Sequence, residues 1–369
     1  MQKNHLVFHS FNALRFFAFF RVFLLHLPLR EGNQFWRKLI SDGGSIGVDF
    51  FFVLSGFLIT YLLVYEKQQS GKINGYYYFL RRSLRIWPLF FTGIGIAYFY
   101  NFITTKLHPG SSSGYSPNIL YSISFLENYQ MILHNDFPRG GPLRAFWSLC
   151  VEEHFYLLWF FIFLLFPTKH LPKIFTMLWL AGIAYRVWFY LNLPENNYYD
   201  IDILSNLDYF CAGGFAGWWV ACKPDWTDQK PKQMSSKWLY CLIVLAIGTF
   251  YLNQYLELNR TDAIYFPVIY ATVFAGFIFV IATRSVSFHF DEKNIFSKLG
   301  KISYGLYVYH LAIILPLAAL LKQTKISLEN NINFFLLAVI SFALTVATSF
   351  LSYKYLELPF LNLKDKFRS

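Results

Sequence analysis

The chain has 369 residues, of which 56% are hydrophobic, 21% are aromatic and only 14% are charged. A soluble domain carries about 25% charged residues, so this composition argues against an ordinary soluble enzyme. It also excludes intrinsic disorder, a collagen-like chain and a disulfide-rich secreted scaffold. The net charge of +11 lies in short blocks between apolar stretches, which is typical of cytoplasmic loops rather than of nucleic-acid binding. We therefore predict a polytopic membrane protein whose partner is the lipid bilayer, with no nucleic acid.

Apolar segments long enough to cross about 30 Å of hydrocarbon recur along the chain. We predict membrane-spanning helices at 10–28, 45–65, 86–104, 147–167, 174–193, 206–222, 238–254, 264–283, 302–322 and 332–353. The segment 118–134 contains Glu127, Asn128 and Gln130, and we expect it to form a re-entrant or interfacial helix. Lys and Arg residues then collect on one side of the membrane, as the positive-inside rule requires. The predicted fold is an all-α bundle of about ten spans, with both termini in the cytoplasm.

The first predicted span carries Arg15 and His26, eleven residues apart. That spacing is almost three helical turns, so both side chains project from one face, roughly 16 Å apart along the axis. A charge inside a span costs at least about 2.5–3.5 kcal/mol unless it faces a cavity or a partner. A lone membrane histidine is often structural, but an imidazole in line with an arginine is also a natural general base. We therefore predict a catalytic role for His26, with Arg15 on the same helix face.

Two arginines, Arg82 and Arg85, follow the second predicted span at i and i+3 spacing, which makes them neighbours on one helix face. They can anchor a cytoplasmic loop, or they can clamp a phosphate, because guanidinium groups bind phosphate in a bidentate manner. The spacing leaves both interpretations open.

Two adjacent carboxylates, Glu152 and Glu153, begin another span on the predicted outer side. They can cap the helix N-terminus, where negative charge is favoured. Alternatively, they can partner an outward-facing histidine or accept hydrogen bonds from sugar hydroxyl groups. Acid–base chemistry of the glycosidase kind is not implied, because adjacent residues point to different faces of a helix.

Several of these residues lie in motifs that together resemble one family, the integral membrane acyltransferase family 3 (OafB-like O-acyltransferases). The motifs occur in the family's order over nearly the whole chain: Phe11–Arg15 with His26, Gly47–Thr60, Arg82–Arg85, Trp147–Tyr156, Ser303–His310 and Glu357–Pro359. The chain departs from the family pattern at Asn12, Cys150 and His154, where Asp, Ser and Gln are usual. The departure at Asn12 puts the role of the first carboxylate of the family in doubt here.

The resemblance implies one integral membrane acyltransferase domain over residues 1–369, and we expect no fused SGNH-hydrolase domain. It also implies a multi-pass protein of the inner (plasma) membrane. The expected reaction moves an acyl group, in the first place acetyl, from cytoplasmic acyl-CoA to a hydroxyl of an extracytoplasmic carbohydrate acceptor. A surface polysaccharide or a lipopolysaccharide O-antigen is an example of such an acceptor. Acyl-CoA is then a donor substrate; we expect no permanently bound cofactor and no metal.

The resemblance also assigns roles to the candidate residues. His26, Arg15, Glu152 and Glu153 are the expected catalytic residues, and Arg82 and Arg85 are expected to bind the donor's phosphates. Further motif residues are expected to bind or orient the substrates: Asp49, Ser55, Tyr304 and His310. Direct attack by the acceptor hydroxyl, deprotonated by His26, is favoured over a covalent acyl-enzyme, because no Ser or Cys stands beside an evident base.

Two other classes of protein are compatible with parts of this sequence. A transporter of a sugar or an anionic metabolite would also have ten spans and intramembrane charges, but we find no internal repeat between its halves. An interaction or scaffold protein would leave Arg15 and His26 without a purpose. An acyltransferase acting on a small molecule, instead of a polysaccharide, also stays open.

Overall fold

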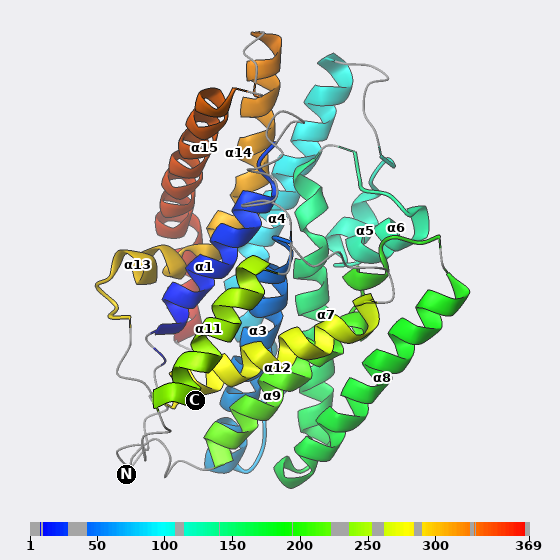
Figure 1. The fold of residues 1–369 in the computed structure, drawn as a ribbon, viewed down its shortest axis with the longest axis vertical. Helices are drawn as coiled ribbons and strands as arrows, with labels where there is room; N and C mark the ends of the chain where they lie inside the picture. Colours follow the sequence, from blue (N-terminus) through cyan, green and yellow to red (C-terminus); the bar gives the residue numbers. More distant parts are fainter. Residues whose placement is uncertain are drawn as a thin grey trace. The chain divides into compact units, whose positions relative to one another are not determined.

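The computed structural model describes residues 8, 10–28, 43–107, 114–139, 141–193, 195–222, 236–252, 262–283, 290–324, 328 and 330–365. In these ranges the chain is helical and forms no strand; one isolated β-bridge joins Tyr115 and Pro138 (Figure 1). The α-helices are α1 (Ser10–Leu25), α3 (Ile46–Ser70), α4 (Gly75–Leu107), α5 (Ile119–Ile123), α6 (Glu127–His134), α7 (Trp147–Leu165), α8 (Leu171–Asn192), α9 (Leu207–Cys222), α11 (Ser236–Leu252), α12 (Asp262–Ala282), α13 (Ile295–Lys301), α14 (Ser303–Gln323), α15 (Asn331–Ser352) and α16 (Leu358–Asp365). Short 3₁₀ turns are η3 (Pro142–Ala145), η4 (Thr168–His170), η5 (Tyr199–Ile201) and η6 (Leu204–Asn206), and η8 (Tyr353–Glu357) is a π-helical turn.

The predicted all-α membrane fold is confirmed. Within the described residues, 7 helical segments are long and apolar enough to cross a membrane: Ile46–Ser70, Gly75–Leu107, Pro142–Leu165, Thr168–Asn192, Ile264–Ala282, Ser303–Gln323 and Asn331–Leu363. The other three predicted spans correspond to α1, α9 and α11, which are helices of 16, 16 and 17 residues. The count of ten spans therefore remains a prediction.

Helix α4 differs from the prediction at its beginning. We predicted a span at 86–104, preceded by a cytoplasmic segment in which Arg82 and Arg85 share one helix face, but α4 starts at Gly75 and continues through Pro88 to Leu107. The shared helix face is therefore present, and only the predicted start of the helix is wrong, because α4 already begins at Gly75. The arginines therefore belong to the same continuous helix as the apolar stretch that follows them.

The segment 118–134 contains two short helices in place of one. Phe125 has a positive φ of 58°, and it separates α5 from α6. Glu127 is buried at the start of α6 and accepts hydrogen bonds from the hydroxyl groups of Tyr115 and Ser122. Burial raises the pKa of the Glu127 carboxyl, and these two hydrogen bonds oppose the increase. Glu127 is thus paired with two hydroxyl groups, and Gln130 accepts a hydrogen bond from the backbone N–H of Asn118.

The described chain divides into two compact units. The first comprises Met1–Ala18, Ser45–Ile73 and Glu152–Gly300, and the second comprises Phe19–Gly44, Asn74–Val151 and Lys301–Ser369. In the first unit α3 packs directly against α9. A β-carbon at Gly213 would lie 1.9 Å from the carbonyl oxygen of Val53, and one at Gly217 would lie 2.3 Å from that of Phe57. Glycine at i and i+4 on α9 therefore allows the two backbones to touch, as in many membrane helix pairs.

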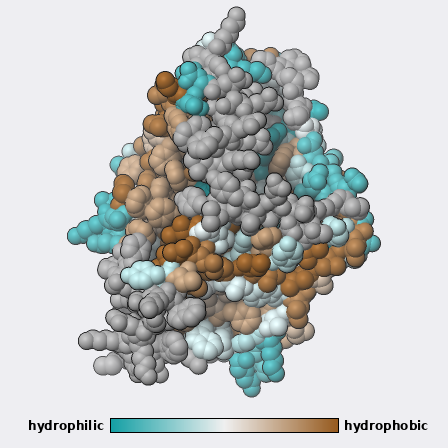
Figure 2. Space-filling model, in the orientation of Figure 1, coloured by the Kyte–Doolittle hydropathy of each residue, from teal (hydrophilic) through white to brown (hydrophobic). Residues whose placement is uncertain are grey.

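In the second unit, α14 packs against α4 and α15. On α15 the side chains of Ser341, Thr345 and Ser349 are fully buried, whereas Val339 and Ile340 are exposed. This arrangement is the reverse of a soluble helix and is expected where the exposed face meets lipid. Figure 2 shows hydrophobic side chains over much of the described surface on one face of the protein.

Candidate functional site

The second unit brings two histidines into contact. His26 directly follows the last residue of α1, and its backbone N–H still bonds the carbonyl of Val22, so the helical path continues to this residue. His310 is fully buried on α14. Its Nε2 lies 3.1 Å from Nδ1 of His26, although 284 residues separate the two histidines in the chain. The sequence named both as candidates, but nothing in it predicted that they form a pair.

The partners of these rings define which nitrogen carries a proton. Nδ1 of His310 bonds the carbonyl oxygen of Tyr307, and a carbonyl can only accept, so this nitrogen must donate. Nε2 of a neutral His310 is then an acceptor. Nδ1 of His26 lies 2.9 Å from the carbonyl of Val22 and within reach of that acceptor, so it also carries the proton. The remaining nitrogen of His26, Nε2, therefore has the free lone pair that a general base needs.

A second set of hydrogen bonds ties η3 to α14 one turn before His310. The hydroxyl of Tyr307 donates to the carbonyl of Ala145 at 3.0 Å and also contacts the hydroxyl of Ser148. Ser148 in turn donates to the Ala145 carbonyl at 3.2 Å. All three residues are buried, and we did not predict them, since 159 residues separate Ser148 from Tyr307. They hold the backbone that carries His310 in one place.

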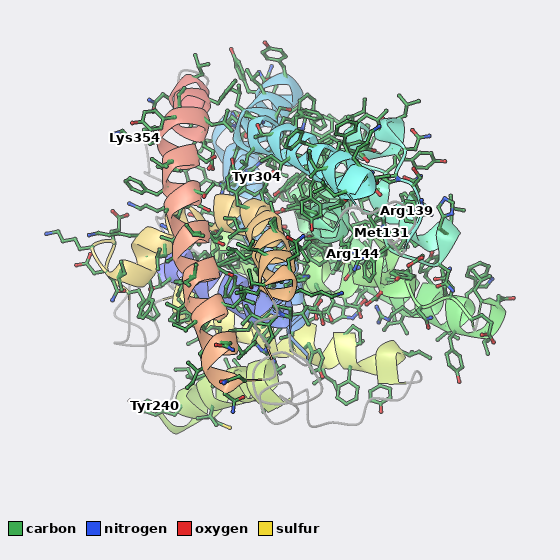
Figure 3. All side chains as sticks on the ribbon, turned by 90° about the horizontal axis from the view of Figure 1, so that it is seen from above. Met131, Arg139, Arg144, Tyr240, Tyr304 and Lys354 are labelled. Atoms are coloured by element: carbon green, nitrogen blue, oxygen red, sulfur yellow. The ribbon has the colours of Figure 1, made fainter. Side chains whose placement is uncertain are left out.

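The two candidate phosphate-binding residues lie near the beginning of α4 in the same unit. Arg82 is partly buried and Arg85 is exposed. Arg85 interacts electrostatically with Glu357, a buried residue of the π-helical turn that follows α15. The hydroxyl of Tyr304, on α14, donates to the carbonyl of Ile86 at 3.0 Å and so joins α14 to α4 just beyond Arg85. Figure 3 shows the position of Tyr304 on α14.

The remaining candidates belong to the first unit. Arg15 donates to the side-chain oxygen of Asn12 at 3.1 Å. An amide oxygen thus fills the place where the family pattern has a carboxylate, and it accepts a hydrogen bond without adding a charge. Asp49, on α3, bonds the hydroxyl of Tyr209 on α9.

Glu152 joins two helices of the first unit. Its Oε1 accepts a hydrogen bond of 2.6 Å from Ser55 on α3, and another from Tyr156 one turn later on α7. Because α7 begins at Trp147, the alternative that Glu152 caps the helix N-terminus is wrong. Glu153 has one buried carboxylate oxygen and belongs to the same helix.

The structure therefore groups the predicted residues in three sets. His26 lies with His310, Arg85 lies with Glu357, and Ser55 lies with Glu152. Among the described residues, no group of three or more His, Cys, Asp or Glu side chains has the arrangement of a metal site. The sets include imidazole rings, which can act as a base, and a guanidinium group, which can bind an anion.

These features define a class: a helical membrane protein with a hydrogen-bonded histidine pair and two arginines on one helix face. The family model of the acyltransferase domain matches residues 8–354, nearly the whole chain. The chain therefore belongs to this acyltransferase family, and the resemblance found in its motifs is confirmed.

Two curated relatives illustrate the similarity. The peptidoglycan O-acetyltransferase OatA of Listeria monocytogenes is 27% identical over 386 residues, covering 97% of this chain and 58% of the relative. The O-acetyltransferase OatA of Staphylococcus aureus is 27% identical over 365 residues, covering 94% of this chain and 56% of the relative. The chain thus spans somewhat more than half the length of these relatives. No solved structure matches it.

Proposed function

We propose that the protein is a membrane O-acetyltransferase that moves an acetyl group from acetyl-CoA to a hydroxyl of a cell-envelope carbohydrate. The observation that carries this proposal is the His26–His310 pair, which leaves Nε2 of His26 as a free base. The names of the relatives support the transfer of an acetyl group to a hydroxyl oxygen, and they make peptidoglycan the first acceptor to test. A surface polysaccharide such as O-antigen is the second.

In the proposed reaction, Arg82 and Arg85 bind the donor's phosphates at the cytoplasmic side of the plasma membrane, where both chain termini also lie. His26 takes the proton of the acceptor hydroxyl, whose oxygen attacks the thioester carbonyl. The C–S bond then breaks, and the thiolate of CoA takes the proton from His26. The products are an ester and free CoA, and His26 returns to its starting state. The supporting role of Arg15, and the orienting or acceptor-binding roles of Asp49, Glu152 and Glu153, are proposed from the family resemblance alone.

The test uses the purified full-length protein in detergent with isotopically labelled acetyl-CoA. Peptidoglycan fragments and an O-antigen polysaccharide are offered separately, and ester formation is followed by mass spectrometry. We expect labelled ester on one of them, and a loss of about 10²–10⁴-fold in the His26→Ala variant, the usual contribution of a general base. A transporter would form no ester with any acceptor. Near-parent activity in well-folded His26→Ala protein would contradict the assigned base.

A further inference from the structure

We infer that Arg144 is a further catalytic residue, whose guanidinium group binds the thioester carbonyl oxygen as it becomes an oxyanion. This inference rests on the proposed acetyl transfer and assigns the electrophilic half of the site, opposite the base His26. All the residues that carry it belong to the second unit: Tyr100, Phe137, Arg144, His26 and His310.

The position of Arg144 is determined by the backbone around η3. Gly141 precedes this turn with a positive φ of 66°, which an L-residue adopts only with strain. A β-carbon at Gly141 would lie 2.2 Å from Leu315 on α14 and 3.6 Å from Tyr100 on α4. The turn therefore starts wedged between α14 and α4. It ends at Ala145, whose carbonyl accepts the hydroxyl of Tyr307. Arg144 lies between these two fixed points.

The same hydrogen-bonded element connects Arg144 to the histidine pair. Tyr307 bonds Ala145 through its hydroxyl and His310 through its carbonyl, and His310 bonds His26. Consistent with this connection, the charge of Arg144 interacts electrostatically with both His26 and Tyr100. A base and a cation are thus held by adjacent parts of one framework.

The guanidinium group of Arg144 has spare capacity to donate. It lies 5.4 Å from the ring centre of Phe137, and its buried Nε makes no hydrogen bond within the described residues. The side chain as a whole is partly exposed, so a substrate can reach it. A buried donor without an acceptor is unfavourable, and a ligand that supplies the acceptor would satisfy it. Figure 3 marks Arg144 among the side chains of this unit.

The reaction supplies that acceptor. When the hydroxyl oxygen attacks the thioester carbon, the carbonyl oxygen gains a negative charge while His26 gains a proton. A guanidinium group already in place stabilises the oxyanion without reorganising, which is the main source of electrostatic catalysis. Collapse of the intermediate re-forms the carbonyl, breaks the C–S bond and releases the thiolate, which takes the proton from His26. Arg144 keeps its protons throughout.

The test compares Arg144→Ala, Arg144→Lys and the parent in the acetyl-transfer assay with whichever carbohydrate the parent acetylates. Removing one oxyanion donor lowers kcat by about 10²–10³-fold. We expect this loss in Arg144→Ala, with an unchanged Kd for a non-hydrolysable thioether analogue of acetyl-CoA. Arg144→Lys should recover only part of kcat, because an ammonium keeps the charge but not the forked geometry. Added guanidinium ion should partly restore Arg144→Ala, a rescue that a purely structural role would not show.

Arg139→Ala is the matched control. Arg139 lies on the same stretch of chain, but it is exposed and donates to the carbonyl of Gly114, so its loss should leave kcat within about 2-fold. Parent-like kcat in Arg144→Ala, or a raised KM for the carbohydrate alone, would overturn the inference while leaving the proposed function intact. If Arg144→Ala does not fold, a parent-like kcat in Arg144→Lys would overturn it equally. A parent protein that forms no ester would overturn the proposed function, and the inference with it.

Discussion

At the scale of single residues, the orientation of His26 depends on two acceptors of its Nδ1 proton, the carbonyl of Val22 and Nε2 of His310. His310 accepts the proton on Nδ1 of His26 and is itself fixed by the carbonyl of Tyr307. The arrangement has the logic of a catalytic triad, in which a buried group selects the tautomer of the base. Here the orienting group is a second imidazole.

We predict that His310→Ala lowers kcat by about 10- to 100-fold, equivalent to about 1.4–2.7 kcal/mol of transition-state stabilisation. The physical reason is that the Nδ1–H of His26 would keep only the carbonyl of Val22 as an acceptor, so the ring would be held less firmly. His310→Gln should recover part of the loss, since an amide oxygen can accept the same hydrogen bond. The measurement is kcat for acetyl transfer, with the Kd for the thioether analogue as the control. Equal kcat in the Ala variant and the parent would exclude an orienting role.

The basic pair on α4 gives a second prediction at this scale. Arg85→Ala should weaken binding of acetyl-CoA by roughly 10- to 150-fold, because a charge-assisted contact contributes about 1.5–3 kcal/mol. Arg85→Lys should recover only part of the affinity if the guanidinium fork holds a phosphate. The Kd for acetyl-CoA, measured on folded protein in detergent, decides whether the arginines clamp a phosphate or anchor the segment. Full recovery by Lys, with Ala lowering only the yield of inserted protein, would indicate an anchor.

At the scale of the helices, the sequence predicted where apolar elements lie better than how they begin and end. Hydropathy locates an apolar stretch by composition, so it does not detect that α4 extends eleven residues upstream, from Gly75 to Arg85, before the predicted span. Nor does it reveal the break at Phe125, which is a property of one backbone angle. Partners such as Ser148 and Tyr307 cannot be predicted from either segment alone, because only the packed helices bring them together.

The close packing of α3 on α9 can be tested with one methyl group. Gly213→Ala would place a β-carbon against the backbone of Val53, which cannot move independently of its helix. Overpacking of this kind costs about 1–3 kcal/mol, so we expect a lower Tm in detergent. Gly276→Ala is the control in the same unit, since its β-carbon would meet only the side chain of Leu242, at an ordinary 3.5 Å. A parent-like Tm in Gly213→Ala would mean that the helices can separate without cost.

At the scale of the whole molecule, the orientation in the membrane remains a prediction of the positive-inside rule. It requires that the segment containing α5 and α6 does not cross. In a chain without its four native cysteines, single cysteines at Ser116 and Asp136 flank these helices and occupy exposed positions. We expect an impermeant thiol reagent to label both from outside intact cells, and to label a cysteine at Gln69 only after permeabilisation. If the cysteines at positions 116 and 136 are labelled from opposite sides, the segment with α5 and α6 crosses the membrane. The inside or outside assignment of every later segment is then inverted.

The length of α4 also connects this protein to the thickness of its bilayer. Its exposed apolar side chains run from Trp87 to Leu107, a rise of about 30 Å at 1.5 Å per residue, which equals the hydrocarbon thickness of a typical membrane. Arg85 lies two residues before Trp87 on the same continuous helix, so its depth in the membrane is tied to the depth of α4. In lipids with longer acyl chains, the guanidinium groups would be drawn toward hydrocarbon, and the membrane would have to thin around α4. Acetyl-CoA affinity should therefore be greatest in bilayers of matching thickness, which makes the choice of lipid a determinant of donor binding.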